Sequence, residues 1–597
     1  MQTFRFSPRP NRAHEIQWRP WGETAFQEAQ REDKPVLLAI SAVWCHWCHV
    51  MDETSYSDAE AIRLINSHYI PIRVDNDQHP EVNQRYNMGG WPTTAFLTPE
   101  GDIIAGGTYI PPHQFKEVLV RVATLYRQQK ASVYRTAQEM RTRRMERIRR
   151  VQAGTPLSFQ VVDSVVRAVT GLYDPFFGGF GSQPKFPMTD AQHLLLDQYA
   201  QTRDPLFLRM VVKTLDSMSQ GALWDKVEGG FFRYSTRRDW SEPHYEKMAE
   251  DQASLLRLYL RAWKVTRQPL YREIAEGIIG YVNKRLHSPD LGVFWGSQDA
   301  DEAYYALDAT GRARTLPPFV DRTVYTNWNG QMVIAYVEAS DLLGQTSLRQ
   351  QAVRALDFLW NNLWSEADKA LFHCWAEGKP FVDGTLTDYA WLTLALAEAY
   401  RRTGTPAMLE RAQTLAHTML ERFWDSHSGG LWDVGPGVAP LGYLQLKEKS
   451  LTDNTVAAEA LRLLSTITGQ STHASRAHDT LTAFVQVAQD YGEHAAAYAR
   501  AVLRHLFPPL EVNIVGPSQA SETHALLDAA FALPYPCVEP LLLDTSDPHA
   551  LASRGFVLGT KPQAYVCLQG ACLPPIDDPA HLTQAVEQFL TLRGQNS

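Results

Sequence analysis

The apolar positions of the first 125 residues follow two patterns, continuous runs and a recurrence at helical spacing. Apolar runs at Val36–Ile40 and Tyr69–Val74 predict buried strands. Apolar residues recurring at intervals of three and four predict helices at Trp21–Glu32, around 50–65 and at Gln114–Tyr126. Strands that alternate with helices are typical of an α/β unit. We therefore expect residues 1–125 to form one α/β domain.

Residues 126–155 are predicted to form a basic connecting helix. Arginines crowd its end, and the apolar positions fall on one helical face: Val118, Leu119, Val122, Leu125, Tyr126, Val133, Met140 and Ile148. A nucleic-acid-binding arm is the alternative, but the aromatic and glycine-rich elements of RNA-binding modules are absent. We expect one long helix whose basic side faces solvent.

A loose repeat begins near residue 156 and predicts a helical ring over residues 156–507. Each unit reads as a helix ending in a bulky aromatic, a glycine-rich turn and a short aromatic strand; the turns are FFGGFGS (176–182), VEGGFFRYS (227–235), DLGVFWGSQ (290–298), ADKALFHCW (367–375) and HSGGLWDVG (427–435). The predicted helix pairs include Ala191–Ala200 with Pro205–Leu223, and Lys247–Thr266 with Leu270–Leu286. A spacing of roughly 50 to 80 residues accommodates two helices per unit. We expect an α/α toroid, with a sixth unit around Asp453–Arg504.

The pattern changes again over residues 508–597, where a small α/β subdomain is predicted. Short apolar strands at Val512–Gly516 and Pro540–Asp544 flank a helix at Ala520–Ala532. The segments before and after Gln569-Gly570 predict a hairpin with Cys567 opposite Cys572, which would allow a redox pair. Two small buried residues are the simpler interpretation of these cysteines. The fold class is therefore multidomain, α/β plus all-α.

Composition narrows the class of protein. The chain has 597 residues, 44% of them apolar, and a net charge of -9, which argues against general nucleic-acid binding. Six cysteines in this length do not make a disulfide scaffold, so a reducing cytoplasm is the expected compartment. We find no export signal and no apolar run that would span a membrane, and we expect no membrane partner.

The candidate chemistry begins at Cys45-His46-Trp47-Cys48-His49, between the strand at Val36–Ile40 and the helix after it. A strand, a tight turn, two cysteines and a helix are the layout of a thioredoxin-type redox site. Backbone N–H groups at a helix N-terminus stabilise a thiolate, so Cys45 is the predicted attacking thiolate and Cys48 the resolving thiol. His46 would favour the thiolate by its charge.

Three other interpretations of this motif are open. Cys-x-x-Cys-His is also the haem attachment signature of c-type cytochromes, which are assembled after export. A zinc site could use Cys45, Cys48 and either His46 or His49, but no second Cys-x-x-Cys pair completes it. The cysteines could also be inert and buried. Thiol redox chemistry is favoured, and we assign no metal and no cofactor.

Pro92 supports the redox interpretation. The stretch from Met88 to Pro99 places a proline before an apolar strand, a little under fifty residues after the cysteines. In thioredoxin folds a cis-proline at this point faces the dithiol and shapes the substrate groove. Cis peptide bonds occur essentially only before proline, so Trp91–Pro92 is the predicted cis bond, with an ordinary trans proline as the alternative.

Several long motifs resemble one protein family. They are SAVWCHWCHVMDETSY (41–56), HYIPIRVD (68–75), GGWPTTAFLTPEGDIIAGGTYIPP (89–112), YDPFFGGFGSQPKFP (173–187), GGFFRYSTRRDWSEPHYEKM (229–248), SQDAD (297–301) and NWNG (327–330). They are similar to motifs of the spermatogenesis-associated, thioredoxin-domain-containing proteins. The resemblance implies a thioredoxin fold joined to an (α/α)6 toroid of the six-hairpin glycosidase type. Relatives are more acidic after Asp75, where this chain has Asn76-Asp77-Gln78-His79-Pro80, so we assign those charges no role.

Toroids of this class bind sugars at their loop-rich end, and that end supplies the second set of candidates. The residues nominated for substrate binding are Lys185, Arg233, Tyr234, Asp239, Trp240, His244, Glu246, Lys247, Asp251, Asp299, Asp301, Trp328, Asn329 and Asp388. Glycoside hydrolysis needs two carboxylates across one bond, whereas epimerisation needs a base such as His244. For each position a structural hydrogen bond or ion pair is the alternative.

The function expected from the sequence is thiol–disulfide exchange by a thioredoxin-type unit coupled to a toroid like those that bind sugars. The alternatives are a carbohydrate-active enzyme (a glycoside hydrolase or sugar epimerase acting in the toroid) and a non-catalytic binding scaffold. The expected partners are a protein thiol client or a small carbohydrate, and no nucleic acid.

Overall fold

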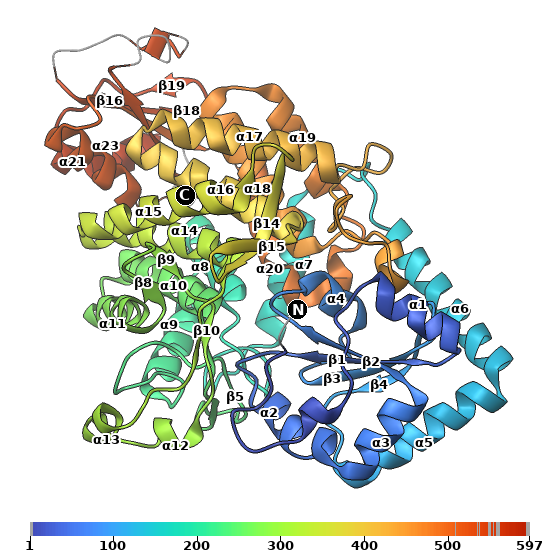
Figure 1. The fold of residues 1–597 in the computed structure, drawn as a ribbon. Helices are drawn as coiled ribbons and strands as arrows, with labels where there is room; N and C mark the ends of the chain where they lie inside the picture. Colours follow the sequence, from blue (N-terminus) through green and yellow to red (C-terminus); the bar gives the residue numbers. More distant parts are fainter. Residues whose placement is uncertain are drawn as a thin grey trace.

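The computed structural model describes residues 4–592, except 508, 534, 536–537, 547–550, 553 and 557–560. The chain folds into a thioredoxin-like α/β domain, a ring of helices and a C-terminal α/β subdomain, which are blue, green to orange, and red in Figure 1. The first and last of these lie on opposite sides of the ring (Figure 1). The predicted fold class, α/β plus all-α, is confirmed.

The thioredoxin-like domain is built on a sheet of order β2-β1-β3-β4. β1 is parallel to β2 and antiparallel to β3, which is antiparallel to β4. Its elements are η1 (Ala13–Glu15), α1 (Glu23–Glu32), β1 (Val36–Ser41), α2 (His46–Glu53), η2 (Ser55–Ser57), α3 (Ala59–His68), β2 (Ile70–Asp75), α4 (Pro80–Tyr86), β3 (Thr93–Leu97), β4 (Ile103–Gly107) and α5 (Pro112–Gln128). Helices α3 and α5 cover one face and α1 and α4 the other. A strand buried on both faces reads as a continuous apolar run, as β1 does.

A loop of the ring completes one of these two cores. Tyr443 and Leu444, in η3 (Gly442–Gln445), pack in the same apolar cluster as β1 and α4. The rings of Tyr86 and Tyr443 stack with centroids 5.5 Å apart, and Tyr86 Oη accepts a hydrogen bond from the Tyr443 backbone N–H at 2.7 Å. The two parts of the chain therefore share apolar packing as well as a surface.

The predicted basic connecting segment contains one helix, α6 (Lys130–Arg149), which is separated from α5 by a break in the helical backbone at Gln129, where φ is -128° and ψ is 36°. Its basic side differs from the prediction, because it does not lie wholly in solvent. Arg141 pairs with Asp102 at 3.2 Å, and Arg144 pairs with Glu448 of the ring, so these arginines fasten the two parts together.

The ring has six inner and six outer helices among the described residues. Each inner helix contacts the next and the last contacts the first, in the order α8, α10, α14, α16, α18 and α20. These inner helices are α8 (Thr189–Thr202), α10 (Ala249–Thr266), α14 (Thr326–Leu343), α16 (Leu386–Thr403), α18 (Leu451–Thr468) and α20 (Ala496–Leu506). The outer helices are α7 (Phe159–Gly171), α9 (Pro205–Gln220), α11 (Pro269–Arg285), α15 (Thr346–Leu363), α17 (Pro406–Phe423) and α19 (Ser471–Thr482). The closed ring and the predicted helix pairs are confirmed.

Short strands and turns lie between the outer helices and the next inner helices, at the N-terminal ends of the inner helices. The strands are β5 (Tyr234–Ser235), β6 (Pro243–His244), β7 (Lys247–Met248), β8 (His287–Ser288), β9 (Val293–Phe294), β10 (Ser297–Gln298), β11 (Val320–Asp321), β12 (Val324–Tyr325), β13 (Trp364–Ser365), β14 (Ala370–Ala376) and β15 (Lys379–Asp383). The same connecting segments contain three short helices, α12 (Glu302–Tyr305), α13 (Ala309–Arg314) and η4 (Ala488–Ala495). We call this end of the ring the mouth.

A lysine–aspartate pair closes three of the repeated turns. Lys185 Nζ lies 2.8 Å from Asp174, Lys247 Nζ 2.7 Å from Asp225, and Lys449 Nζ 2.8 Å from Asp425. Each lysine also donates to a backbone carbonyl of its own turn or the next loop. Buried charges are stable only when they are paired and hydrogen-bonded, so the pairs are part of the repeat.

Three amide side chains repeat in the same way. Asn329 accepts a hydrogen bond from the Phe294 backbone N–H and donates to its carbonyl, both at 2.9 Å. Gln252 and Asn454 bridge the backbones of Phe231 and Leu431 in the same manner. Each amide satisfies both polar groups of one buried turn residue, which fixes the turn against an inner helix.

The C-terminal subdomain has a sheet of order β17-β16-β18-β19. Its elements are β16 (Leu510–Gly516), α21 (Ser521–Ala532), β17 (Val538–Asp544), β18 (Gln563–Leu568), β19 (Ala571–Cys572) and α23 (Pro579–Leu592). The predicted hairpin is confirmed: Gln569 and Gly570 both have positive φ, as a two-residue hairpin turn requires, and Cys567 pairs with Cys572 across the strands in a disulfide. None of the helices in the described ranges is long and apolar enough to cross a membrane.

Candidate functional site

The Cys45–Cys48 pair lies where β1 leads into α2. Cys45 is the residue immediately before the helix, and its Sγ accepts a hydrogen bond from the Cys48 backbone N–H at 3.2 Å. The two sulfurs form a disulfide, with the Cα atoms 5.2 Å apart. The Trp91–Pro92 bond is cis, as predicted. The sulfurs thus have the N-terminal helix position that stabilises a thiolate when the pair is reduced.

The sulfur predicted to attack is shielded from solvent in this arrangement of the chain. Cys45 is only 4% exposed and Cys48 only 2%. Both sulfurs belong to the same apolar cluster as the interior of the ring, together with Ala42 and Trp44. The sequence could not show this, because the covering residues come from the mouth of the ring rather than from the thioredoxin-like domain.

Two histidines of α2 contact the mouth directly. His49 Nε2 lies 3.0 Å from Asp299 Oδ1, and the His46 ring is edge-on to that of His244 with centroids 6.5 Å apart. A pocket of about 310 Å³ adjoins this contact, lined by His46, Trp47, Thr236, Ser241, Glu242, Pro243, His244, Tyr245, Ala300 and Glu302. Two of the nominated ring residues, His244 and Asp299, therefore lie beside the dithiol helix.

Arg233 holds the two tryptophans that flank the dithiol. Its guanidinium lies 4.2 Å from the Trp44 ring centroid and 5.0 Å from that of Trp91. Trp44 Nε1 donates to Asp77 Oδ2 at 2.6 Å. Cation–π contacts of this kind strengthen when they are shielded from water. Arg233 is thus a ring residue that orders the surroundings of the cysteines.

Carboxylates gather beneath Arg233, and their pKa values diverge. Burial and the neighbouring Asp251 raise the pKa of Glu250 to about 8, and burial raises that of Asp251 to about 6. Although burial acts to raise it, the hydrogen bond and charge of His244 and the charge of Arg233 hold the pKa of Glu246 below its usual value. Near pH 7 this site holds a protonated and an ionised carboxyl group, which is the combination that acid–base catalysis uses.

Asp77 and Asp321 extend the acidic cluster toward the thioredoxin-like domain. Burial raises the pKa of Asp77 to about 6 and also raises the pKa of Asp321. Tyr325 Oη donates to Asp321 Oδ2 at 2.8 Å. The acids therefore come from both sides of the junction.

His373 links the two sides through its imidazole. Its Nδ1 lies 2.7 Å from Asp388 Oδ1 and its Nε2 lies 2.7 Å from the backbone oxygen of Asp77. Burial acts to lower the pKa of His373, but Asp388 raises it well above the usual value. Because both nitrogens face acceptors, both donate, and the ring is an imidazolium.

The structure places the other nominated residues as follows. Tyr234 stacks on His244 with ring centroids 4.5 Å apart, at the rim of the pocket, and Trp328 packs against Tyr325 inside the mouth. Others make structural contacts. Lys185 and Lys247 form the ion pairs of the repeated turns, and Asn329 bridges the backbone of Phe294. Trp240 is fully buried and its Nε1 donates to the Phe177 backbone oxygen, while Asp301 caps α12 and Asp388 caps α16 and contacts His373. Asp239 is exposed and accepts a hydrogen bond from Ser241.

The sequence did not lead us to nominate Glu250, Asp77, Asp321, Trp44 or His373, and it suggested His49 only as a possible zinc ligand. Two signals could have found some of them. Glu250 and Asp251 are adjacent acids that open an inner helix, and Asp77 follows a buried strand at its carboxyl end. Among the residues that the structure describes, no group of three or more His, Cys, Asp or Glu side chains is arranged to hold a metal ion.

Comparison with known proteins supports the N-terminal assignment and the family. A family model described as Thioredox_DsbH, a protein of unknown function (DUF255), matches residues 9–145. The thiol:disulfide interchange protein DsbD of Campylobacter jejuni is 31% identical over 75 residues, which are 12% of this chain and 13% of that protein. The structure of cellobiose 2-epimerase from Spirochaeta thermophila DSM 6192 aligns with 58% of this chain and 94% of its own, at 15% identity and a TM-score of 0.47.

A similarity in sequence covers both parts of the chain. Human spermatogenesis-associated protein 20 is 27% identical over 707 aligned positions, which cover 95% of this chain and 89% of the human protein. The aligned range includes both the dithiol block and the ring motifs, because it spans nearly the whole chain. The resemblance to the spermatogenesis-associated, thioredoxin-domain-containing proteins is thereby confirmed, and the similarity extends along almost the entire chain.

Proposed function

We propose that this chain is a thiol–disulfide oxidoreductase whose Cys45–Cys48 pair exchanges with a small disulfide at the mouth of the ring. The observation that carries the proposal is the bonded pair of cysteines at the first turn of α2. A helix N-terminus lowers the pKa of a thiol and makes the first cysteine the nucleophile.

The exchange balances as a two-electron transfer. The Cys45 thiolate attacks one sulfur of the substrate disulfide, forms a mixed disulfide and releases the other half as a thiolate, which takes up a proton. Cys48, after losing its proton, attacks Cys45 Sγ and releases the second half. The substrate is reduced to two thiols, the pair is oxidised, and a cellular thiol of the glutathione class restores it.

The burial of the pair favours a small substrate over a folded protein client. Cys45 is enclosed by the mouth of the ring, whereas the pocket of about 310 Å³ ends at His46 and Trp47, the residues between the cysteines. A low-molecular-weight disulfide would enter there. A protein client would require the ring and the thioredoxin-like domain to separate. We place the reaction in the cytoplasm, where small disulfides and reducing thiols coexist.

Alkylation followed by mass spectrometry, across a series of glutathione redox buffers, tests this proposal. We expect a Cys45–Cys48 disulfide that forms and is lost reversibly, and turnover of a small disulfide that Cys45→Ser abolishes. Cys572→Ser is the matched control, because Cys572 belongs to the disulfide of the C-terminal subdomain, on the opposite side of the ring. A pair that never forms a disulfide, or turnover unchanged in Cys45→Ser, would refute the assignment.

The acid cluster supports a second candidate, carbohydrate chemistry within the mouth. A raised pKa at Glu250 and a lowered one at Glu246 supply a proton donor and a base in one enclosure. In epimerisation His244 would be the base.

A thermal-shift screen of small glycans tests this candidate against the first. We expect a sugar that stabilises the wild type to lose that effect in Glu250→Gln and His244→Gln, with Cys45→Ser unaffected. Asp239→Asn, at an exposed position, is the control. Failure of every glycan to shift the melting temperature would leave thiol exchange as the function of the mouth.

A further inference from the structure

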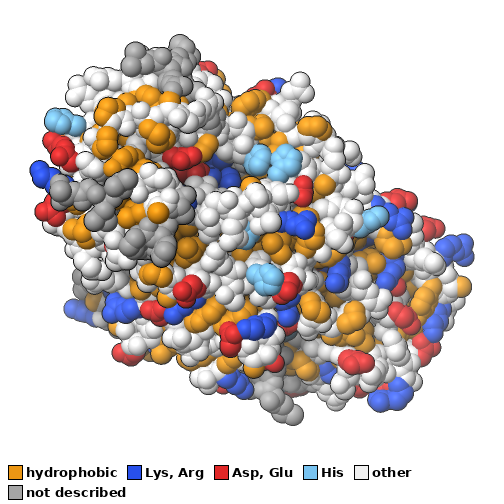
Figure 2. All heavy atoms as spheres, turned by 90° about the horizontal axis from the view of Figure 1, so that it is seen from above, with side chains coloured by type: hydrophobic (Ala, Val, Ile, Leu, Met, Phe, Trp, Pro, Cys, Tyr) orange, Lys and Arg blue, Asp and Glu red, His pale blue; other side chains and the backbone are white. Residues whose placement is uncertain are grey.

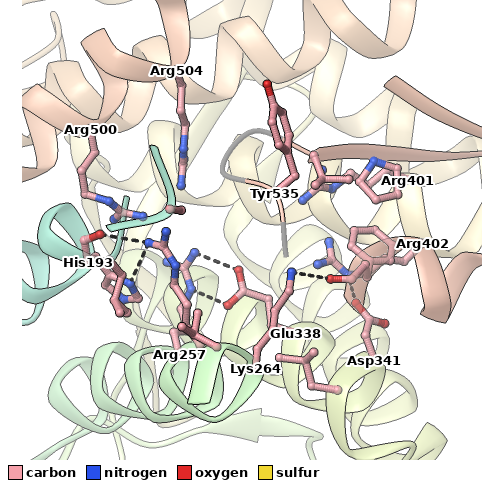
Figure 3. Close-up of a pocket in the computed structure, with 18 residues that line it drawn as sticks. His193, Arg257, Lys264, Glu338, Asp341, Arg401, Arg402, Arg500, Arg504 and Tyr535 are labelled. Carbon is pink, nitrogen blue, oxygen red and sulfur yellow. Dashed lines mark hydrogen bonds and ion pairs between the residues drawn. The ribbon is translucent and has the colours of Figure 1, made fainter. Parts of the chain in front are cut away.

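A second pocket lies at the opposite end of the ring, beneath the C-terminal subdomain (Figure 3). We call it the basic pocket. It has a volume of about 190 Å³, and among the described residues its charged lining consists of seven cationic side chains and two acidic ones: Arg257, Arg261, Lys264, Arg401, Arg402, Arg500 and Arg504, with Glu338 and Asp341. They come from the C-terminal halves of inner helices, so the pocket is remote from the dithiol.

Most of these arginines are paired with carboxylates at the edge of the pocket. Arg257 makes a two-pronged contact with Glu338, at 2.8 and 2.9 Å, as Figure 3 shows. The remaining pairs are Arg261 and Arg500 with Asp197, Arg401 with Glu398, Arg402 with Asp341 and Glu398, and Arg504 with Glu459. Arg500 also lies 3.9 Å from Asp190, so six carboxylates face the seven cations of the lining.

Lys264 is the cation for which no carboxylate partner lies within 4.0 Å in the described part of the chain. Its Nζ donates to the backbone oxygen of Phe531, at 2.7 Å, and points toward the centre of the residues drawn in Figure 3. Burial and the nearby Arg261 lower the pKa of Lys264 to about 7. A lysine so placed is costly to keep charged, and an anion in the pocket would remove that cost.

We propose that the basic pocket binds a small anion bearing a phosphoryl group, either inorganic phosphate or a phosphate monoester. Cations reach it from α10, α16 and α20, so donors converge from several directions. A tetrahedral phosphoryl group has acceptor oxygens on several sides, whereas a carboxylate presents two in one plane.

The size and lining of the pocket are consistent with this ligand. Its volume exceeds the roughly 150 Å³ of an engineered cavity that holds benzene, and a bound water needs only about 30 Å³. Apolar side chains complete the wall: Leu196, Ala200, Val265, Leu342, Phe531, Val538 and Pro540. They would accept the short carbon skeleton of a phosphate monoester.

A purely structural role explains these cations less well. Basic residues at helix C-termini are favourable beside the helix dipole, but that effect needs only exposed side chains. On the face of the molecule seen in Figure 2, basic and acidic side chains are interspersed over the part that the structure describes. In the lining of the basic pocket, cationic side chains outnumber acidic ones by seven to two, and they are enclosed. A chain with a net charge of -9 concentrates positive charge here, as an anion site requires.

Calorimetric titration of the full chain at pH 7 and fixed ionic strength tests the proposal, with inorganic phosphate, glycerol phosphate and succinate as separate ligands. We expect saturable binding of at least one phosphoryl ligand. Lys264→Met should weaken it roughly tenfold or more, which is the loss of one charged hydrogen bond. Methionine fills a similar volume, so this variant should keep the melting temperature of the wild type. Arg411→Gln is the matched control, because Arg411 pairs with Asp357 on the outer helices, and its affinity should stay within twofold.

The ligands distinguish the sources of the phosphoryl group. Tighter binding of glycerol phosphate than of phosphate would assign a monoester, and the reverse would assign inorganic phosphate. Absence of binding by both, tighter binding of succinate, or unchanged affinity in a folded Lys264→Met variant would each overturn the proposal.

Discussion

The two ends of the helical ring carry opposite chemistry. At the mouth, acids occupy the first turns of α10, α16 and α18, and burial raises the pKa values of Glu250 and Asp251. At the other end, arginines and a lysine occupy the last turns of α10, α16 and α20. The six inner helices all begin at the mouth, so their dipoles add, with the positive ends at the mouth and the negative ends at the basic pocket. The shared direction of these helices thus favours the observed sorting of charge.

The two ends are expected to be chemically independent. Cys45→Ser should abolish disulfide turnover completely while leaving the affinity for a phosphoryl ligand within twofold of the wild type, because the residues lie on opposite ends of the ring. Lys264→Met should do the reverse. Turnover and calorimetric titration of both variants measure this. Loss of anion binding in a folded Cys45→Ser protein would show that the ends are coupled.

Removing one arginine should cost far more at the basic end than at the mouth. Arg402 is 2% exposed and pairs with Asp341 and Glu398, so Arg402→Met removes a buried cation from two carboxylates, which keep Arg349 and Arg401 as partners, and should lower the free energy of unfolding by about 3 kcal/mol. Arg233 makes cation–π contacts with Trp44 and Trp91, so Arg233→Met should cost about 1 kcal/mol. Urea unfolding at pH 7 compares them, and equal losses would contradict the difference in pairing.

The two ends should also respond to pH with opposite sign. The folded pKa of Glu250, about 8, lies above its unfolded value, so the folded state holds the proton and stability relative to Glu250→Gln falls as pH rises from about 5 to 8. The folded pKa of Lys264, about 7, lies below its unfolded value, so stability relative to Lys264→Met falls as pH drops from about 10 to 7. Glu250 and Lys264 are both half-buried, so we expect slopes below the roughly 1.4 kcal/mol per pH unit of one full proton. Unfolding midpoints from pH 5 to 10 measure both; slopes of the same sign would contradict the contrast.

Local features of the molecule could be predicted from the sequence. The strand, the dithiol and the helix after it are contiguous, and the turn at Gln569-Gly570 sets the register that brings Cys567 to Cys572. The helix pairs of the ring repeat regularly enough to be read from apolar spacing and glycine-rich turns.

The sites could be predicted only in part, because distant segments build them. Lys185 and Lys247 are polar residues in conspicuous motifs, but partners 11 and 22 positions away neutralise them inside the turns. The burial of Cys45 depends on ring residues, which no local pattern of the thioredoxin-like domain reveals. The basic pocket needs Arg257 and Arg500 side by side, and a single sequence does not indicate which helices close the ring.

The stacking of Tyr443 on Tyr86 bears on how this protein is to be dissected. A loop more than 300 residues away fills one face of the N-terminal sheet, together with Leu444. A fragment ending at residue 125 would therefore expose to water the apolar face that Tyr443 and Leu444 cover. We expect it to aggregate rather than to fold as an independent thioredoxin domain. The thioredoxin-like domain and the ring are therefore not separable folding units, because residues of the ring form part of the hydrophobic core of the thioredoxin-like domain.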